Sequence, residues 1–115
     1  MRTFSISLAV AAAFVAGASV LPAAADETGM ASIHSWRKVG KKTCFIGHSH
    51  AGSGSGPNRK AAEAAAINSW RSFTALEYGS SWADFRIAIE KTMRCGANAP
   101  NNVACDLDAT PCRPY

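Results

Sequence analysis

The sequence lacks the short motifs by which many enzymes and metal proteins are recognised. It contains no Cys-x-x-Cys pair, a common cysteine spacing of metal sites. It has no Gly-x-Ser-x-Gly turn, which carries the nucleophile of many serine hydrolases. The glycine-rich run over 47–56 is not followed by the Lys-Ser or Lys-Thr pair of a phosphate-binding loop. These absences argue against a cysteine-based metal site, a serine hydrolase and a nucleotide-binding domain.

Only one stretch of the chain is apolar over a long range. Residues 4–21 follow a short basic start and precede small residues and then polar sequence. This pattern is typical of a secretory signal peptide, with an uncleaved membrane anchor as the alternative. We expect a leader over 1–25 that is cleaved near Ala25, a flexible segment over 26–32, and one small domain over 33–115. The protein is then secreted or periplasmic, and no later run is long enough to span a bilayer.

Four cysteines lie outside the predicted leader. An even number in an exported chain predicts disulfides, here two, which stabilise a small domain by restricting the unfolded chain. Four cysteines allow three pairings. The pairing that we favour joins Cys95 to Cys112 and Cys44 to Cys105.

Neither sign of charge dominates the chain. Its twelve Lys and Arg include Arg2 in the predicted leader, so eleven remain against eight Asp and Glu. This mild positive balance is compatible with an anionic partner such as lipopolysaccharide or a membrane surface. We do not expect a nucleic-acid partner.

One segment has a strong helical pattern. Residues 58–78 contain no glycine or proline and are rich in alanine. Pro57 stands where proline favours the first helical position, and Gly79 stands where glycine ends helices. Trp70 marks the centre of an apolar face on a helical wheel. The other members of that face are Ala66, Ile67, Phe73 and Thr74, and it is flanked by Ala62 and Tyr78.

Three shorter segments have strand patterns. Residues 43–47 precede the helix, and residues 85–95 alternate apolar and polar side chains with a period of two, although a helix over the latter is the alternative. Residues 103–107 form a third expected strand. Irregular structure is expected at 47–56, 96–102 and 108–115. The order strand, helix, strand, strand predicts an α+β domain: a small sheet of about three strands, one long helix packed on one face, and disulfides to stabilise it.

A set of residues along the helix and the two later strands carries a resemblance. They are Asn58-Arg59, Ala66-Ile67, Trp70, Tyr78-Gly79, Trp82, Cys95, Cys105 and Pro111-Cys112. Their spacing over 54–112 resembles a family of small secreted proteobacterial proteins. The resemblance implies export, to the periplasm, and a compact strand–helix–hairpin unit. It brings no catalytic residues with it, and it does not extend to Cys44 or the histidines.

Four basic residues are candidates for binding an anion. Arg59 and Lys60 lie in the first turn of the predicted helix, where backbone amides attract negative groups. Arg86 and Arg94 lie on the polar face of the predicted strand over 85–95. They predict a surface for an acidic partner, although a solvated sheet face is the alternative.

The histidines are the candidates for metal binding or acid–base chemistry. His48 and His50 point the same way on an extended segment, and His34 would supply a third ligand for zinc or copper. A ribonuclease-type hydrolase would instead use His34 and His48 as acid and base, with Lys41 or Lys42 to hold the phosphate charge.

We expect a binding or envelope-associated module rather than an enzyme, with an envelope or extracellular partner that is anionic. A periplasmic metal-binding protein that uses the His48 and His50 segment is the alternative, and a small hydrolase is a more distant one. No cofactor is expected outside the metal alternative. The junction between the glycine-rich run and the helix, with His48, His50, Arg59 and Lys60, is where we expect a site.

Overall fold

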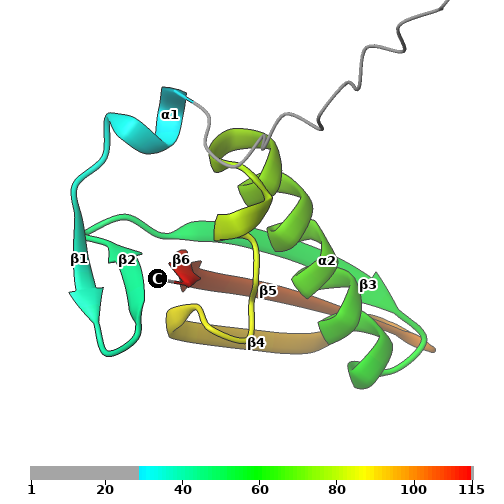
Figure 1. Cartoon of the computed structure of the whole chain (residues 1–115). Coiled ribbons are helices and arrows are strands. Elements are labelled where there is room, and N and C mark those ends of the chain that lie inside the picture. The colour runs from blue at the N-terminus through cyan, green and yellow to red at the C-terminus, as the bar shows by residue number, and fades with distance from the viewer. Residues whose placement is uncertain (1–28, 115) are drawn as a thin grey trace, which may run out of the picture.

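The computed structural model describes residues 29–114, so the predicted leader lies outside the described residues. One long helix and two three-stranded antiparallel sheets form an α+β fold with two disulfides, which confirms the predicted fold class (Figure 1). Within 29–114, no helix is long and apolar enough to cross a membrane.

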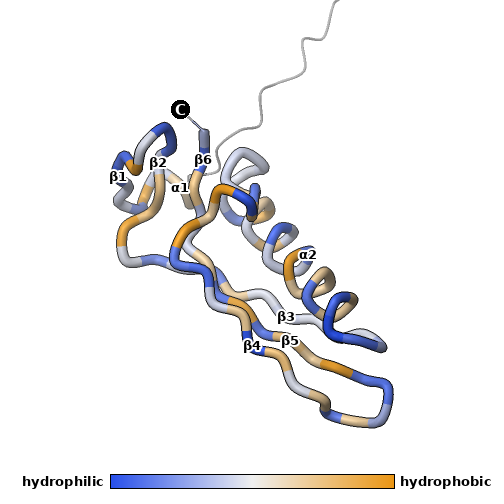
Figure 2. Tube along the Cα trace, turned by 90° about the horizontal axis from the view of Figure 1, so that it is seen from below, coloured by the Kyte–Doolittle hydropathy of each residue, from blue (hydrophilic) through white to orange (hydrophobic). Residues whose placement is uncertain are grey.

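The first two strands and the last strand of the chain form one sheet, and the three strands between them form the other. The larger sheet has the order β3-β5-β4 and the smaller one the order β1-β2-β6. Figure 2 shows α2 lying along the larger sheet, with β1, β2 and β6 grouped at one end. In chain order the elements are α1 (Gly29–Ser32), β1 (Trp36–Val39), β2 (Lys42–Phe45), β3 (His50–Gly56), α2 (Arg59–Tyr78), the 3-10 helix η1 (Ser80–Trp82), β4 (Ile89–Ala99), β5 (Asn102–Thr110) and β6 (Cys112–Pro114).

The first described residues are more ordered than the sequence predicts. Residues 29–32 of the expected flexible segment form the short helix α1, and Ala31 is fully buried against Phe45, Tyr78 and Trp82. A single small side chain therefore anchors α1 to an aromatic cluster.

The long helix begins two residues later than predicted, at Arg59 and not at Pro57. Asn58 is the cap, because its side-chain oxygen accepts a hydrogen bond from the Ala61 N–H at 2.9 Å. Pro57 therefore precedes the cap and does not occupy the first helical position. At the other end the Gly79 N–H donates to the Ala75 carbonyl at 2.9 Å, and Gly79 has a φ of 101°, which favours glycine.

The buried face of α2 is narrower than the predicted one. Phe73 was expected on this face but is 53% exposed, while Trp70 is fully buried. The buried residues recur every four positions, so they form one straight row along the helix. They are Ala62, Ala66, Trp70, Thr74 and Tyr78.

The glycine-rich run is the largest correction, because the part expected to be irregular contains strand β3. A Cβ atom at Gly52 would lie 2.5 Å from the Ala66 carbonyl oxygen, and one at Gly54 would lie 2.5 Å from the Ala65 carbonyl carbon. Glycine in a strand allows another backbone to approach closely. The absence of side chains at these glycines therefore allows the backbone of α2 to pack directly against the strand.

The hairpin after the helix is shifted toward the C-terminus. Strand β4 starts at Ile89 and not at residue 85, because the Arg86 N–H donates to the Asp84 side chain at 3.0 Å and forms a turn there. At the far end β4 continues to Ala99, so the expected turn over 96–102 shrinks to the two residues that follow.

The expected irregular tail also belongs to strands. Residues 108–110 complete β5, and β6 pairs with β2 so that Cys112 lies directly opposite Cys44. The disulfides are Cys44–Cys112 and Cys95–Cys105, each across a pair of antiparallel strands. The favoured pairing was therefore wrong, because the tail folds beside β2 and not beside the hairpin.

The core has two parts that match the two sheets. The larger part lies between α2 and the larger sheet, and the Trp70 indole donates from Nε1 to the Ala109 carbonyl at 3.2 Å. In the smaller part the Phe45 and Trp82 rings stack with centroids 4.2 Å apart and planes 7° apart. Helix α2 reaches both parts, because Trp70 belongs to the larger part and Tyr78 packs on Phe45 at 4.7 Å in the smaller one.

Candidate functional site

All three histidines of the chain gather around the last turn of α2. The ring centroids of His34 and His48 are 4.3 Å apart, and those of His48 and His50 are 5.6 Å apart. His34 follows α1, His48 lies between β2 and β3, and His50 is the first residue of β3. The fold thus brings together the three residues that the sequence marked as candidate ligands.

Tyr78 lies at the centre of this cluster. Its hydroxyl is 2.9 Å from Nε2 of His50 and is also hydrogen-bonded to Nε2 of His48. The side chain is fully buried, and burial together with the nearby Glu77 carboxylate raises the pKa of Tyr78 to about 12. The phenol is therefore protonated at neutral pH and donates to one of the two imidazoles.

His50 has polar partners on both ring nitrogens. Its Nε2 atom lies 2.9 Å from the Glu77 carboxylate, and its Nδ1 atom lies 3.3 Å from the Thr74 hydroxyl. A carboxylate only accepts, so in the neutral ring Nε2 carries the proton and Nδ1 accepts from Thr74. The Tyr78 hydroxyl then donates to His48. Burial lowers the pKa of His50, so the ring is neutral in the folded protein at neutral pH.

The other two imidazoles are less deeply placed. His34 donates from Nδ1 to the Met30 carbonyl at 2.7 Å. His48 is half-buried, and burial, followed by the proximity of His34, lowers its pKa. Across residues 29–114, no three His, Cys, Asp or Glu side chains already stand as a ligand group for a metal ion. The point on which two imidazoles converge is the Tyr78 hydroxyl.

The basic residues at the start of α2 do not join this cluster. Arg59 and Lys60 are exposed, and Arg59 pairs with Glu63 one turn along at 2.8 Å. The rest of strand β3 separates them along the chain from His50, its first residue. The expected site at the junction of the glycine-rich run and the helix therefore does not form as one unit.

The two arginines expected on one strand face are also separated. Arg86 precedes β4 and binds the Asp84 carboxylate at 2.8 Å, and these hydrogen bonds lower the pKa of Asp84 to about 2. Arg94 lies in β4 directly opposite Asp106 of β5. Each arginine thus lies near a carboxylate, and the larger sheet does not present a uniformly basic face.

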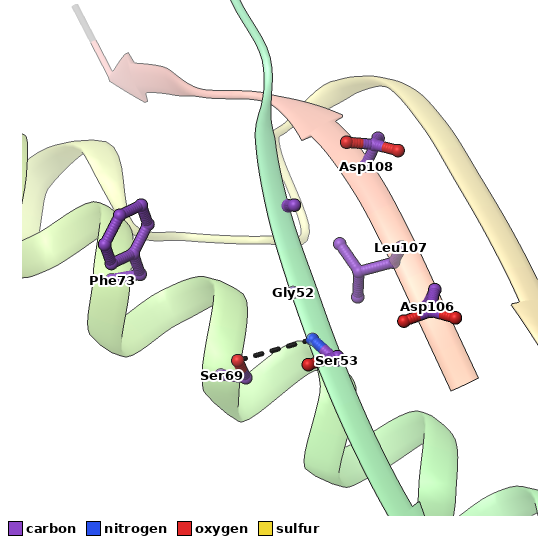
Figure 3. A pocket seen from close by; sticks show the side chains of 8 residues that line it. Gly52, Ser53, Ser69, Phe73, Asp106, Leu107 and Asp108 are labelled. Carbon is purple, nitrogen blue, oxygen red and sulfur yellow. Dashed lines mark hydrogen bonds between the residues drawn. The ribbon is translucent and has the colours of Figure 1, made fainter. Parts of the chain in front are cut away.

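A hollow of about 320 Å³ lies at the outer edge of β3 (Figure 3). The Ser53 N–H crosses it to donate to the Ser69 hydroxyl at 3.3 Å. None of the candidate anion or metal residues lines this hollow. Its lining comes from α2, β3 and β5: Ala51, Gly52, Ser53, Ser69, Phe73, Asp106, Leu107 and Asp108.

Elements α1, β1 and β2 form one end of the molecule (Figure 1). No Asp or Glu occurs between Glu27 and Glu63. The β1–β2 hairpin nevertheless carries four cations: Arg37, Lys38, Lys41 and Lys42. A fifth cation from β6, Arg113, lies over the Trp36 ring at 5.5 Å. This end of the molecule is therefore strongly basic.

Among the described residues, the same end carries most of the large exposed apolar side chains. Six large apolar side chains are exposed among the described residues, and four of them fall within residues 30–46. Ile46 lies beside β1, because its N–H donates to the Ser35 carbonyl at 2.9 Å. The four are Met30 at 44% exposure, Ile33 at 72%, Trp36 at 38% and Ile46 at 51%. We call residues 29–46 with Arg113 the basic end.

No protein-family model, curated protein or solved structure matches the chain. Function must therefore be inferred from the side chains that the fold brings together. The resemblance to small secreted proteobacterial proteins stays a prediction.

Sequence reasoning marked the histidines but missed their partners. Glu77 and Tyr78 follow one another at the end of α2, and Thr74 lies one turn earlier. They contact histidines that are about thirty residues away in sequence, and only the fold brings them together. The basic end was visible as a cluster of Lys and Arg, but the exposure of its apolar residues was not.

Proposed function

We propose that this protein is an exported module that binds the anionic lipid surface of the cell envelope through its basic end. One observation carries the proposal: residues 29–46 present cations and exposed apolar side chains together, in a segment without a single carboxylate. Proteins that bind at a lipid interface combine these two features.

The chemistry of each group suits a lipid headgroup region. Lys and Arg near an anionic membrane contribute about 1 kcal/mol each to binding. Trp36 is part exposed and part stacked on Trp82, at 5.7 Å between centroids, and tryptophan is enriched at the depth of the headgroups. Ile33 and Ile46 would add apolar area on insertion. The cations would attract the anionic membrane at long range, and the apolar side chains would be buried in it on contact.

The exposed aliphatic side chains distinguish lipid from other anionic partners. A nucleic acid or an acidic polysaccharide offers phosphates, carboxylates or sulfates, but little that would bury Met30, Ile33 and Ile46. A bilayer offers both negative headgroups and hydrocarbon. The two disulfides agree with the predicted export, which would bring the protein to an envelope membrane.

The test is sedimentation of the mature chain with lipid vesicles. We expect binding to vesicles that contain phosphatidylglycerol, weak binding to phosphatidylcholine vesicles, and loss of binding as salt increases. Replacing two exposed cations of the basic end, Arg37→Gln with Lys41→Gln, should weaken binding about thirtyfold, which corresponds to about 1 kcal/mol for each charge.

The matched control removes two cations at the opposite end of α2, Arg59→Gln with Lys60→Gln. It has the same net charge as the first variant and should bind nearly as well as the wild type. An equal loss in both variants would show that net charge, not the basic end, governs binding. Retention on heparin without sedimentation with anionic vesicles would assign the surface to an acidic polymer and overturn the lipid proposal.

A further inference from the structure

We infer that the cluster at the end of α2 is a binding site for a Cu²⁺ or Zn²⁺ ion, with Nε2 of His48, Nε2 of His50 and the phenol oxygen of Tyr78 as ligands. Both nitrogens already lie within hydrogen-bonding distance of the same oxygen. Three donor atoms from three different positions thus converge on one small volume. The proposed lipid-binding function does not depend on this site.

The surroundings of the histidines have the outer contacts that metal ligands use. A ligating imidazole commonly donates its other N–H to an oxygen, which fixes the ring and leaves the ligating nitrogen with its lone pair. The Thr74 hydroxyl lies 3.3 Å from Nδ1 of His50, so that nitrogen can carry the proton while Nε2 binds the ion. His34 shows the same kind of contact through Nδ1 to the Met30 carbonyl.

The charges at the site favour a divalent cation. The Glu77 carboxylate lies 2.9 Å from Nε2 of His50, where it would also approach a bound ion. Binding would move the His50 proton from Nε2 to Nδ1 and release the Tyr78 phenol proton to water. The resulting phenolate and carboxylate would balance the two charges of the ion. Because a proton is released, the ion should bind more tightly at higher pH.

The donor set selects the class of metal. Two imidazole nitrogens and a phenolate oxygen suit Cu²⁺ and Zn²⁺, and Cu²⁺ binds more tightly in the usual order of divalent ions. Sulfur ligands do not enter, because all four cysteines are in disulfides. His50 and Tyr78 are buried, whereas His48 is half-buried and provides the side from which an ion can enter.

The test is titration of the chelator-treated mature chain with CuSO₄, followed by absorption and by thermal unfolding. We expect one equivalent of Cu²⁺ to bind, to raise the melting temperature, and to produce a visible phenolate-to-copper charge-transfer band. ZnCl₂ should compete and remove the band. Tyr78→Phe keeps the ring and should abolish the band, and His48→Gln should abolish the melting-temperature shift.

The third histidine provides the matched control. His34→Gln removes an imidazole beside the site but not a ligand, so the stoichiometry and the band should remain. Circular dichroism and the metal-free melting temperature show whether each variant is folded. If Tyr78→Phe does not fold, His48→Gln becomes the decisive variant. Equal copper binding by the wild type and His48→Gln, or no band in the wild type, would overturn the site.

Discussion

The two sheets of this protein are covered in opposite ways. On the larger sheet the backbone of α2 lies directly against β3, and a Cβ atom at Gly54 would overlap it. The smaller sheet is instead packed through large aromatic side chains, with the Phe45 and Trp82 ring centroids 4.2 Å apart. Close backbone contact makes this half compact, and none of the candidate anion or metal residues lines the hollow at the edge of β3. The aromatic half leaves cations and apolar side chains exposed, and it is the half to which we assign binding.

The largest losses of stability should come from removing the disulfides, one of which lies in each half. Cys44–Cys112 joins residues 68 apart in sequence, whereas Cys95–Cys105 joins residues 10 apart. Loop-closure entropy predicts that replacing the first pair by alanine lowers the free energy of unfolding by about 4 kcal/mol and the second by about 3 kcal/mol. Urea unfolding of the two double variants measures both values. A larger cost for the second pair would contradict this ranking.

The close contact in the compact half should make Gly54 nearly irreplaceable. Gly54→Ala places a Cβ atom 2.5 Å from the α2 backbone, so the helix must shift, and we expect a loss of about 3 kcal/mol. Gly96→Ala in the same sheet meets nothing within 4 Å and should change the free energy of unfolding by less than about 0.5 kcal/mol. Urea unfolding again decides, and equal costs at the two positions would show that the helix does not lie against β3.

The glycines of β3 contain a strand pattern that was not recognised from the sequence. Gly52, Gly54 and Gly56 alternate with serines, which is a period of two, the spacing of a strand face. The usual weakening effect of glycine in strands argued for a loop instead. The requirement for glycine comes from a helix that packs against the strand, so tertiary contact outweighed local propensity.

Other features were predictable to different degrees. Helix α2 was predictable because its alanines, its cap region and Gly79 are local signals. The disulfide pairing was not predictable, because it depends on the pairing of β6 with β2. These two strands are neighbours in the sheet but lie near opposite ends of the domain's sequence. The histidines were recognisable by type, but Tyr78 became part of their cluster only through the fold.

The turn at Asp84 and Arg86, between η1 and β4, should make a small pH-dependent contribution to the free energy of unfolding. Hydrogen bonds from Arg86 lower the pKa of Asp84 from 3.8 to about 2, so the folded state favours the ionised carboxylate. Its contribution to stability is complete above the unfolded pKa and is lost as the pH falls from about 4 through about 2. The effect on the free energy of unfolding should be the smallest of this series, because Arg86 is 82% exposed.

Titration of the side-chain carboxyl carbon by NMR measures that pKa directly. Arg86→Gln should raise the pKa of Asp84 toward its ordinary value, while Arg94→Gln, which lies opposite Asp106, should leave it unchanged. An unchanged pKa in Arg86→Gln would show that the turn does not depend on this pair.

Tryptophan fluorescence in the presence of brominated anionic lipid tests the assignment of binding to the basic end most directly. Trp70 and Trp82 are fully buried, whereas Trp36 is 38% exposed on the proposed membrane-facing surface. We predict that vesicles containing phosphatidylglycerol shift the emission to shorter wavelengths, that brominated lipid quenches it, and that Trp36→Phe loses both responses while the protein still sediments with vesicles. Vesicle binding by the wild type without quenching, or the same quenching in Trp36→Phe, would contradict the assignment.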